Sequence, residues 1–167
     1  ISINGRHPES FQRFDASPGE VLPGVPMVVI INGRSASAAE IVTVALRDLG
    51  RAAVIGSRSY GKGTVQTVIP LPNKGVFNVT WARIFAPSGQ SLDSQGIVPA
   101  ICTNVSNDQI TEIFNALATK FNHQQVNRDS LQAKSYQPHF FIERQASCQP
   151  TDIQSPNDMR AARLLLN

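Results

Sequence analysis

The sequence predicts an α/β fold, because two short apolar runs flank a segment with helical periodicity. Residues 26–32 and 52–57 are rich in β-branched and other apolar side chains and are bounded by proline, asparagine or glycine, as buried strands are. Residues 38–49 between them predict a helix with an apolar face. That face would carry Ala38, Val42, Ala45, Leu46 and Leu49. Strand, helix and strand in this order indicate an α/β layer.

The corner between the first strand and the helix holds a candidate nucleophile. Ser37 lies there, at a helix N-terminus whose outward N–H groups and positive dipole end suit a reactive hydroxyl. Ser37 to Glu40 also spell a capping box, in which the hydroxyl and the carboxylate only satisfy free helix N–H groups. For an isolated Ser-x-x-Glu, capping is the simpler explanation. On this motif alone both explanations stay open.

A lysine between two glycines follows the second strand. Gly61 and Gly63 give Lys62 little side-chain cover and allow its backbone to approach other groups closely. In an apolar pocket the amine would be desolvated, and in its neutral form it could take a proton from a serine. The alternative is a solvated lysine in a turn, which is the usual environment of this residue. Composition does not separate the two.

Three linked motifs resemble the carboxy-terminal processing (tail-specific) serine peptidases. They are Ser35-Ala-Ser-Ala-Ala-Glu40, Arg47-Asp-Leu-Gly-Arg-Ala52 and Gly61-Lys-Gly-Thr-Val-Gln66. Residues 82–89 and 96–99 are similar to the strand and loop that follow in the family. The resemblance therefore extends over residues 22–101.

The resemblance implies roles for particular residues. Ser37 would be the nucleophile, Lys62 the general base and Gln66 the residue that orients the lysine. The backbone N–H of Ala38 would form part of the oxyanion hole, and a glycine-rich turn upstream of this chain would form the rest. Glu40 and Asp48 would support the site structurally.

Chain geometry limits two of these roles. Gln66 follows Lys62 by four residues, which is about 13 Å along a strand but about 6 Å in a helical turn. Its catalytic role therefore requires a turn, although residues 65–69 look like a strand. Asp48 lies about 16 Å from Ser37 along a straight helix, too far for contact. We expect Asp48 to hold the helix end or a neighbouring arginine.

Three positions depart from the family pattern. Arg34 replaces a small or acidic residue, Thr43 replaces a glycine, and Ala100 replaces an aspartate. None of these changes removes a catalytic group. Arg34 is the one expected to alter access to the site.

The resemblance also implies the architecture and the location of the protein. We expect a ClpP/crotonase-like peptidase core of ββα units, partial in this chain and covering residues 1–105, with a C-terminal helical extension over residues 106–167 packed on it. A complete member carries a PDZ domain before this point, so the chain is expected to be a catalytic-core fragment. The family resemblance further implies an exported bacterial protein of the periplasm or cell envelope.

The first part of the chain and its centre predict simpler elements. Residues 1–3 are expected to end a strand whose partners lie upstream, and residues 5–25 to form a loop. Residues 65–71 and 76–85 alternate around a turn and predict a hairpin. Its core face would carry Phe77, Val79, Trp81 and Phe85, with a substrate-facing Trp81 as the minority alternative. An extended peptide could add to a free edge of this hairpin.

Two helices are predicted near the C-terminus. Ser106 to Gln109 form a capping box, followed by a core stripe of Ile110, Ile113, Phe114, Leu117 and Phe121. Residues 123–138 are expected to be a loop and residues 140–142 a short strand. Ser155 to Asp158 begin a final helix. Its apolar residues are Met159, Ala162, Leu165 and Leu166.

Cysteine and histidine usage suggests one disulfide and no metal site. Cys102 and Cys148 are the only cysteines, and in an envelope-type protein they are disulfide candidates, with two unrelated buried thiols as the alternative. No metal or other cofactor is expected, because the three histidines lack ligand spacing. They are His7, His123 and His139.

Nucleotide and nucleic-acid binding are both disfavoured. Residues 56–62 nearly match a phosphate-binding loop, but Gly63 stands where Ser or Thr should bind magnesium, and a strand-like segment follows in place of a helix. The formal net charge of +3 comes with dispersed arginines and no basic stripe with interleaved aromatic residues.

Three functions are compatible with the sequence. The leading one is a serine endopeptidase that cuts proteins near unstructured carboxyl termini through a dyad of Ser37 and Lys62. The second is a catalytically inactive peptide-binding or scaffold fragment on the same fold. The third is a non-proteolytic enzyme of crotonase-like architecture, for which no residue pattern requires an acyl-CoA. No transmembrane segment is present, while contact with a membrane surface and homo-oligomerisation stay open.

Overall fold

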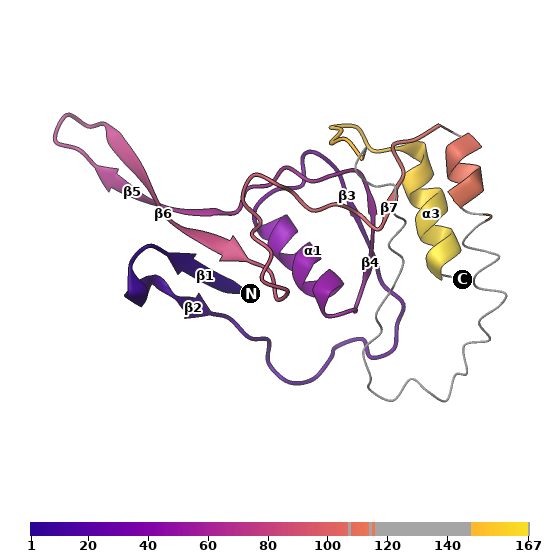
Figure 1. Ribbon diagram of the computed structural model, residues 1–167, viewed down its shortest axis with the longest axis horizontal. Helices are drawn as coiled ribbons and strands as arrows, with labels where there is room; N and C mark the ends of the chain where they lie inside the picture. The colour runs from indigo at the N-terminus through magenta and orange to yellow at the C-terminus, as the bar shows by residue number, and fades with distance from the viewer. Residues whose placement is uncertain (107, 114, 116–147, 167) are drawn as a thin grey trace.

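The computed structural model describes residues 1–106, 108–113, 115 and 148–166. Their strands form two sheets (Figure 1). One is antiparallel, in the order β2-β1-β6-β5. Its strands are β1 (Ser2–Gly5), β2 (Gln12–Arg13), β5 (Thr64–Pro70) and β6 (Val76–Phe85). The other is parallel, in the order β3-β4-β7. Its strands are β3 (Val28–Ile31), β4 (Ala53–Gly56) and β7 (Ile101–Cys102).

The parallel sheet lies between two layers, which makes this part of the chain an α/β structure. Alternate strand residues face opposite sides of a sheet, and the two hydrophobic clusters follow that alternation. Ile31 and Val54 pack with Val44 of α1 (Ala38–Asp48) and with Ile84 of β6. Ile55 and Ile101 face the other side, where they pack with Ile110, Ala161 and Ala162. The predicted strand-helix-strand unit is therefore confirmed.

The buried face of α1 differs from the predicted one. Val42 is 57% exposed and Leu49 is 68% exposed, whereas Glu40, Thr43 and Val44 are buried. Two polar residues are tolerated on the buried face because each has partners: the Thr43 hydroxyl donates to the carbonyl oxygen of Ala39 at 2.7 Å, and Glu40 is fully hydrogen-bonded. The apolar pattern alone therefore predicted the wrong face of the helix as the buried face.

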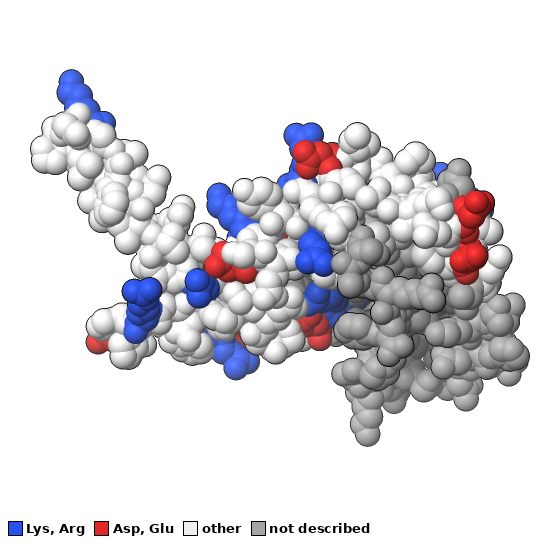
Figure 2. All heavy atoms as spheres, turned by 45° about the horizontal axis from the view of Figure 1, so that its top comes forward, with Lys and Arg blue, Asp and Glu red and all other residues white. Residues whose placement is uncertain are grey.

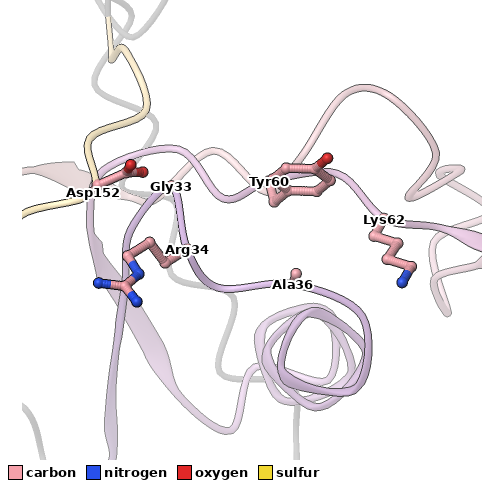
Figure 3. A pocket seen from close by; sticks show the side chains of 6 residues that line it. All are labelled: Gly33, Arg34, Ala36, Tyr60, Lys62 and Asp152. Atoms are coloured by element: carbon pink, nitrogen blue, oxygen red, sulfur yellow. The ribbon is translucent and has the colours of Figure 1, made fainter.

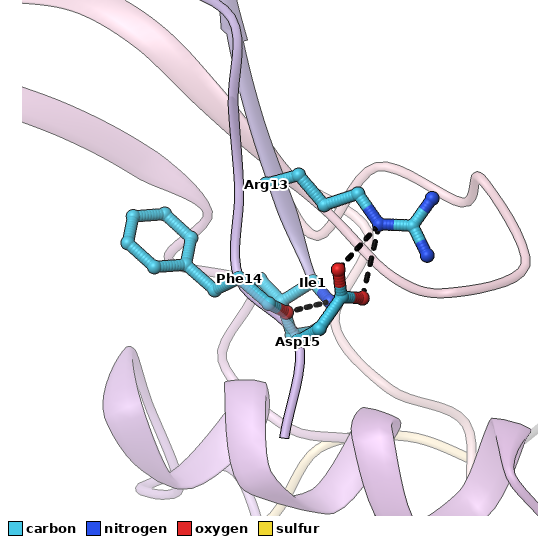
Figure 4. A network of polar contacts seen from close by, with 4 residues as sticks. All are labelled: Ile1, Arg13, Phe14 and Asp15. Atoms are coloured by element: carbon cyan, nitrogen blue, oxygen red, sulfur yellow. Dashed lines mark hydrogen bonds and ion pairs between the residues drawn. The ribbon is translucent and has the colours of Figure 1, made fainter. Parts of the chain in front are cut away.

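The N-terminal segment belongs to the antiparallel sheet. β1 pairs with β6 and with β2, so the expectation that its partners lie upstream is wrong, and the expected loop over residues 5–25 contains β2 and the short 3-10 helix η1 (Pro8–Ser10). Figure 4 shows how the segment continues beyond β2. The amine of Ile1 donates to the carbonyl oxygen of Phe14 at 3.2 Å, and an Arg13–Asp15 ion pair of 2.9 Å lies beside it.

The β5–β6 hairpin forms an arm that projects from the body (Figure 1). The predicted strands are confirmed, but the predicted core face is wrong over the outer part of the arm, where Phe77 is 58% exposed and Trp81 is 37% exposed. Side-chain alternation identifies which residues share a face but not whether another layer covers that face. Apart from Lys74 near its tip, the arm between residues 64 and 80 carries no formal charge (Figure 2).

The C-terminal part packs on the far side of the parallel sheet. The predicted capping box is present, because the Gln109 N–H donates to the Ser106 hydroxyl at 3.3 Å, and residues 108–113 are helical. Ile110 is fully buried and Ile113 is partly buried, as predicted. The predictions for Phe114, Leu117, Phe121 and residues 123–142 lie outside the described residues.

The last helix, α3 (Pro156–Leu166), begins where it was predicted to begin. The Asp158 carboxylate accepts from the N–H of Ser155 at 2.9 Å. The predicted apolar face of α3 is partly wrong. Met159 and Leu166 are exposed, and the buried residues are Asn157, Asp158, Ala161 and Ala162. The two small alanines allow the helix to approach β3 and β4 closely, which explains why they and not the larger side chains face the sheet.

Cys102 and Cys148 form a disulfide with a Cα–Cα distance of 5.8 Å. The bridge joins the end of β7 to residue 148, where the described chain resumes. Within the described ranges, no helix is both long enough and apolar enough to cross a membrane.

Candidate active site

Ser37 occupies a strained corner between β3 and α1. It is the N-cap of α1, and its backbone angles are φ 56° and ψ −118°. A positive φ is uncommon for a residue that has a Cβ, and such conformations cost about 1–3 kcal/mol and cluster at functional sites. Ser37 is exposed, so the corner lies at the surface of the molecule.

The buried carboxylate of Glu40 connects the two predicted catalytic residues. Oε2 accepts from the backbone N–H of Ser37 at 2.9 Å and from that of Lys62 at 2.8 Å. Oε1 accepts from the backbone N–H of Gly61 at 2.7 Å and from the Ser59 hydroxyl at 2.5 Å. Glu40 is 0% exposed. Its carboxylate therefore fixes the backbone of Ser37 and the backbone of Lys62 relative to each other.

The capping box predicted from Ser37 and Glu40 is thus only part of what Glu40 does. Both halves of the box are present: the Glu40 carboxylate accepts from the Ser37 N–H at 2.9 Å, and the Ser37 side chain faces the Glu40 N–H, although not in the geometry of a regular capping hydrogen bond. The other three donors reach Glu40 from residues 59–62, far along the sequence. The local motif could not reveal these contacts.

Ser59 is a supporting residue that the sequence did not single out. Its hydroxyl donates to Glu40 and accepts from the backbone N–H of Ile97 at 2.6 Å, and the residue is 2% exposed. Ser59 therefore ties the loop around Ile97 to the carboxylate that holds Ser37 and Lys62. No local signal separates it from Ser57, another buried serine between the strand and the Gly-Lys-Gly motif.

The glycines beside Lys62 allow close backbone approach, as expected. A Cβ at Gly63 would lie 2.3 Å from the backbone nitrogen of Asp93, and one at Gly61 would lie 2.7 Å from that of Gly96. The chain segment over residues 92–96 therefore lies directly against the lysine segment. These contacts orient the Lys62 backbone while leaving its side chain free to turn.

The Lys62 side chain lies at the edge of an open hollow of about 530 Å³. The hollow is lined by Gly33, Arg34, Ala36, Tyr60, Lys62 and Asp152. Figure 3 shows the lysine projecting toward the turn that carries Ala36. The side chain is exposed, so the apolar pocket that would desolvate it is not formed here. Within the described part of the chain, its amine makes no hydrogen bond or ion pair, and none joins it to Ser37.

Gln66 is not brought to Lys62. It lies in β5, beside an irregularity in the pairing between Val65 and Gln66, and its side-chain amide donates to the Thr80 hydroxyl at 2.9 Å. The turn that its implied role requires is absent between Lys62 and Gln66, because β5 already begins at Thr64. In this structure the side chain of Gln66 stabilises the hairpin.

Asp48 joins the end of α1 to the turn over residues 86–90. Its carboxylate lies 2.9 Å from the Arg47 guanidinium and accepts from the backbone N–H of Ser88 at 3.1 Å. Arg47 also donates to the side chain of Gln90 at 3.1 Å. These contacts agree with the structural role expected for Asp48 and are made at the opposite end of the helix from Ser37.

The role of Asp48 has a direct test. We expect Asp48→Ala to lower the free energy of unfolding by about 1–3 kcal/mol, because the Ser88 N–H loses its acceptor and Arg47 keeps only its bond to Gln90. Turnover per folded molecule should change less than about threefold, since the residue does not reach the site. Urea unfolding and peptide hydrolysis measure the two effects. Asp15→Ala, in an exposed ion pair, is the control, with an expected loss below about 1 kcal/mol. A hundredfold fall in turnover without loss of fold would assign Asp48 a catalytic role.

The three departures from the family pattern lie in different surroundings. Arg34 lines the hollow, Thr43 is buried in α1, and the N–H of Ala100 donates to the carbonyl oxygen of Val54 at 2.7 Å. In the described residues, no group of three or more His, Cys, Asp or Glu side chains is arranged to hold a metal ion. His123 and His139 lie outside those residues.

A strained serine at the start of a helix, joined through a carboxylate to a lysine segment, is the kind of site found in hydrolases that use a nucleophile. The family model of Peptidase family S41 matches residues 1–103. The chain therefore belongs to Peptidase family S41, a family of peptidases. The matched region contains both sheets and α1, and it ends one residue after β7.

The curated relatives are carboxyl-terminal processing proteases. One from Bartonella bacilliformis is 48% identical over 101 residues, which is 60% of this chain and 23% of the relative. One from Bacillus subtilis is 38% identical over 76 residues, covering 46% of this chain and 16% of the relative. The chain thus spans less than a quarter of the length of either relative.

Solved structures give similar matches over part of the chain. A photosystem II D1 C-terminal processing protease is 34% identical with a TM-score of 0.42, covering 51% of this chain and 21% of that protein. Mature CPAF is 27% identical with a TM-score of 0.43, covering 47% and 15% respectively.

Proposed function

We propose that this chain carries the nucleophile and the general base of a serine endopeptidase that cuts proteins near their carboxyl termini. The observation that carries the proposal is the double attachment of Glu40, which binds the backbone N–H groups of Ser37 and Lys62 through one oxygen. Such an arrangement keeps a strained serine and a lysine at a fixed backbone separation. Membership of a peptidase family and relatives named carboxyl-terminal processing proteases support the same function.

In the proposed reaction, the neutral amine of Lys62 takes the proton of the Ser37 hydroxyl while the Ser37 oxygen attacks the scissile carbonyl carbon. The resulting lysine ammonium gives a proton to the leaving amine as the peptide bond breaks, which leaves an acyl ester on Ser37. Water then attacks the ester in a second step that uses Lys62 in the same way. In each step Lys62 takes up one proton from the attacking group and gives one proton to the leaving group, so its amine is neutral again at the end.

The start of α1 supplies a donor for the oxyanion of this reaction. The N–H of Ala38, one of the first helix N–H groups, has no hydrogen-bond partner in the described part of the chain. It points out of the helix end at which negative charge is stabilised. A second donor from outside this chain would complete the oxyanion hole.

We infer that this arrangement is a latent form of the proposed site, because no hydrogen bond joins Ser37 to Lys62 among the described residues. Lys62 has an exposed side chain on a fixed backbone, and we propose that rotation about its side-chain bonds brings the amine toward Ser37 when the site assembles. A bound peptide or another segment of the full-length protein would exclude water and favour that rotation. Gln66 would orient the amine only if the start of β5 rearranges.

The wider assignments follow from the same proposal. We assign residues 1–105 to a partial peptidase core of the ClpP/crotonase-like ββα type and residues 106–167 to an extension packed on it, in keeping with α3 against β3 and β4. The substrates would be proteins with unstructured carboxyl termini, in the periplasm or cell envelope of a bacterium.

A cleavage assay tests the function directly. The full-length protein is incubated with an unstructured peptide that has a free carboxyl terminus, and the products are identified by mass spectrometry. We expect cuts within the last residues, and protection when the same peptide carries a folded domain at its carboxyl end. Equal cleavage of both substrates would exclude tail specificity, and no cleavage of either would exclude the peptidase reaction.

A peptide-binding fragment without catalysis is the second candidate. Among the described residues, the outer edge of β5 pairs with no other strand and the arm exposes apolar residues; both favour this candidate, because an extended peptide can pair with such an edge through backbone hydrogen bonds. Isothermal titration calorimetry of this chain with unstructured peptides distinguishes the two candidates. Saturable binding with intact peptide at the end of the titration supports the binding fragment, and absence of binding counts against it.

A further inference from the structure

A short segment from the C-terminal part of the chain lies against the turn that leads to Ser37. This strap, residues 148–152, crosses near the carboxyl ends of β3 and β4. The N–H of Gly33 donates to the carbonyl oxygen of Thr151 at 2.6 Å. The N–H of Thr151 donates to the Ser57 hydroxyl at 3.3 Å, so the strap is bound to the segments that follow both strands.

The strap also forms part of the hollow beside Lys62. Asp152 lines the hollow, and Figure 3 shows Asp152 and Gly33 at one end and Lys62 at the other. The fit is close. A Cβ at Gly33 would lie 3.0 Å from the carbonyl oxygen of Thr151 and 3.2 Å from the Asp152 carboxylate, so any side chain there would push the strap away.

The disulfide holds the strap at its first residue. Cys148 is bonded to Cys102, which pairs with Gly56 at the end of β4. Cys148 is buried, whereas residues 149 and 150 are exposed. The strap therefore has a covalent attachment at Cys148 and backbone hydrogen bonds at Thr151. It lies outside the region that the family model matches, residues 1–103.

We propose that the strap is a positioning element of the site and that the Cys102–Cys148 disulfide keeps it in place, so that reduction of this bond lowers turnover at Ser37. The turnover part rests on the proposed function, in which Ser37 is the nucleophile. A dithiol reductant would supply two electrons and two protons, convert the cystine to two cysteine thiols and leave as a cyclic disulfide. The strap would then lose its covalent attachment at Cys148, and the N–H of Gly33 would lose the carbonyl oxygen of Thr151 as its acceptor.

The physical basis is the short distance along the chain between Gly33 and Ser37. Gly33 begins the turn that ends in the strained Ser37. Motion of the backbone at Gly33 therefore also moves the backbone that orients the nucleophile. A misplacement of about 1 Å at a catalytic group can cost about a hundredfold in rate. The strap thus acts through the turn and does not touch the reacting atoms.

Amide hydrogen exchange tests the structural half of the proposal without any need for activity. We expect the Gly33 amide to exchange about tenfold faster after reduction, while the Ala53 amide, bonded to the carbonyl oxygen of Met27, keeps its rate. Alkylation and mass spectrometry verify that both cysteines are reduced. Equal acceleration of both amides would indicate general destabilisation and would overturn the proposal, as would an unchanged Gly33 amide.

Peptide hydrolysis by the full-length protein tests the functional half. We expect reduction to lower kcat about tenfold with KM changed less than about threefold, because the strap orients the nucleophile. The Cys102→Ser/Cys148→Ser double variant should match the reduced protein and should not respond to the dithiol. A double variant with full kcat would contradict the proposal. If the oxidised protein cleaves nothing, the proposed function fails, and the exchange result on Gly33 still decides whether the strap is held by the disulfide.

Two single variants displace the strap while the disulfide stays intact. Gly33→Ala forces the strap outward, and Ser57→Ala removes the acceptor of the Thr151 N–H. Both should speed exchange at Gly33, or at residue 33 in the alanine variant, and lower kcat in the same direction as reduction. Ser10→Ala is the matched control, because Ser10 is a similarly buried, hydrogen-bonded serine distant from the strap. If Gly33→Ala and Ser57→Ala lowered kcat no more than Ser10→Ala does, the proposal would be overturned.

Discussion

Replacing Ser37 with alanine is expected to abolish peptide cleavage, with a fall in kcat on the order of 10⁴–10⁶-fold. The variant removes the attacking oxygen but keeps the backbone N–H that donates to the Glu40 carboxylate, so the fold should be retained. Lys62→Met should cause a similar fall, because methionine keeps the length of the side chain and removes its amine. In the double variant the loss should be no larger than in either single variant, since the two residues act as one unit.

Matched controls separate this loss from general damage. Ser88 is an exposed serine near the far end of α1, and Lys74 is a lysine near the tip of the arm with a similarly exposed side chain. Ser88→Ala and Lys74→Met should each keep turnover within about twofold of the starting protein, as distant surface changes do. Circular dichroism and size-exclusion chromatography check that every variant is folded. Substantial cleavage by folded Ser37→Ala or Lys62→Met would refute the dyad.

Replacing Glu40 with glutamine is expected to reduce both stability and turnover. Two donors face each carboxylate oxygen, and an amide nitrogen in either place leaves at least one backbone N–H without an acceptor. A buried group left unpaired in this way costs about 1–3 kcal/mol, and removal of the charge adds to it. We expect a total loss of about 2–5 kcal/mol in the free energy of unfolding and a fall of about a hundredfold in kcat.

Urea unfolding gives the stability change, and peptide hydrolysis below the unfolding transition gives the change in kcat. Glu20→Gln is the control, because Glu20 is a partly exposed glutamate that pairs with Arg51, and its loss should stay below about 1 kcal/mol. If Glu40→Gln were as stable and as active as this control, the carboxylate would not be the anchor of the site.

The parts of the fold that local patterns determine were predictable. β3, α1 and β4 follow from short apolar runs and a helical segment, and the helical residues 108–113 and the start of α3 follow from the capping residues before them. The surroundings of each element were not predictable in the same way. The alternation in β6 gives its two faces, yet only the three-dimensional arrangement leaves Phe77 and Trp81 uncovered. Likewise, α1 buries Glu40 and Thr43 because tertiary and backbone partners satisfy them.

The same distinction between local patterns and tertiary contacts applies to the site. Ser37 and Lys62 stand out through their motifs, but their connection through Glu40 depends on contacts between segments about twenty residues apart. The strap was harder still to predict. The two cysteines suggested a bridge, but only the path of the chain brings Thr151 to Gly33 and Asp152 to the hollow. Gln66 shows the converse, since a motif implied a role that its strand position does not support here.

The roles of Ser37 and Lys62 can be seen in a structure of the full-length protein with a peptidyl phosphonate bound. We expect a covalent bond between phosphorus and the Ser37 oxygen, the Lys62 amine within about 3 Å of that oxygen, and an oxyanion oxygen facing the Ala38 N–H. Modification of a different residue would rule out Ser37 as the nucleophile. A phosphonylated Ser37 whose Lys62 amine still projects into solvent would exclude Lys62 as the general base.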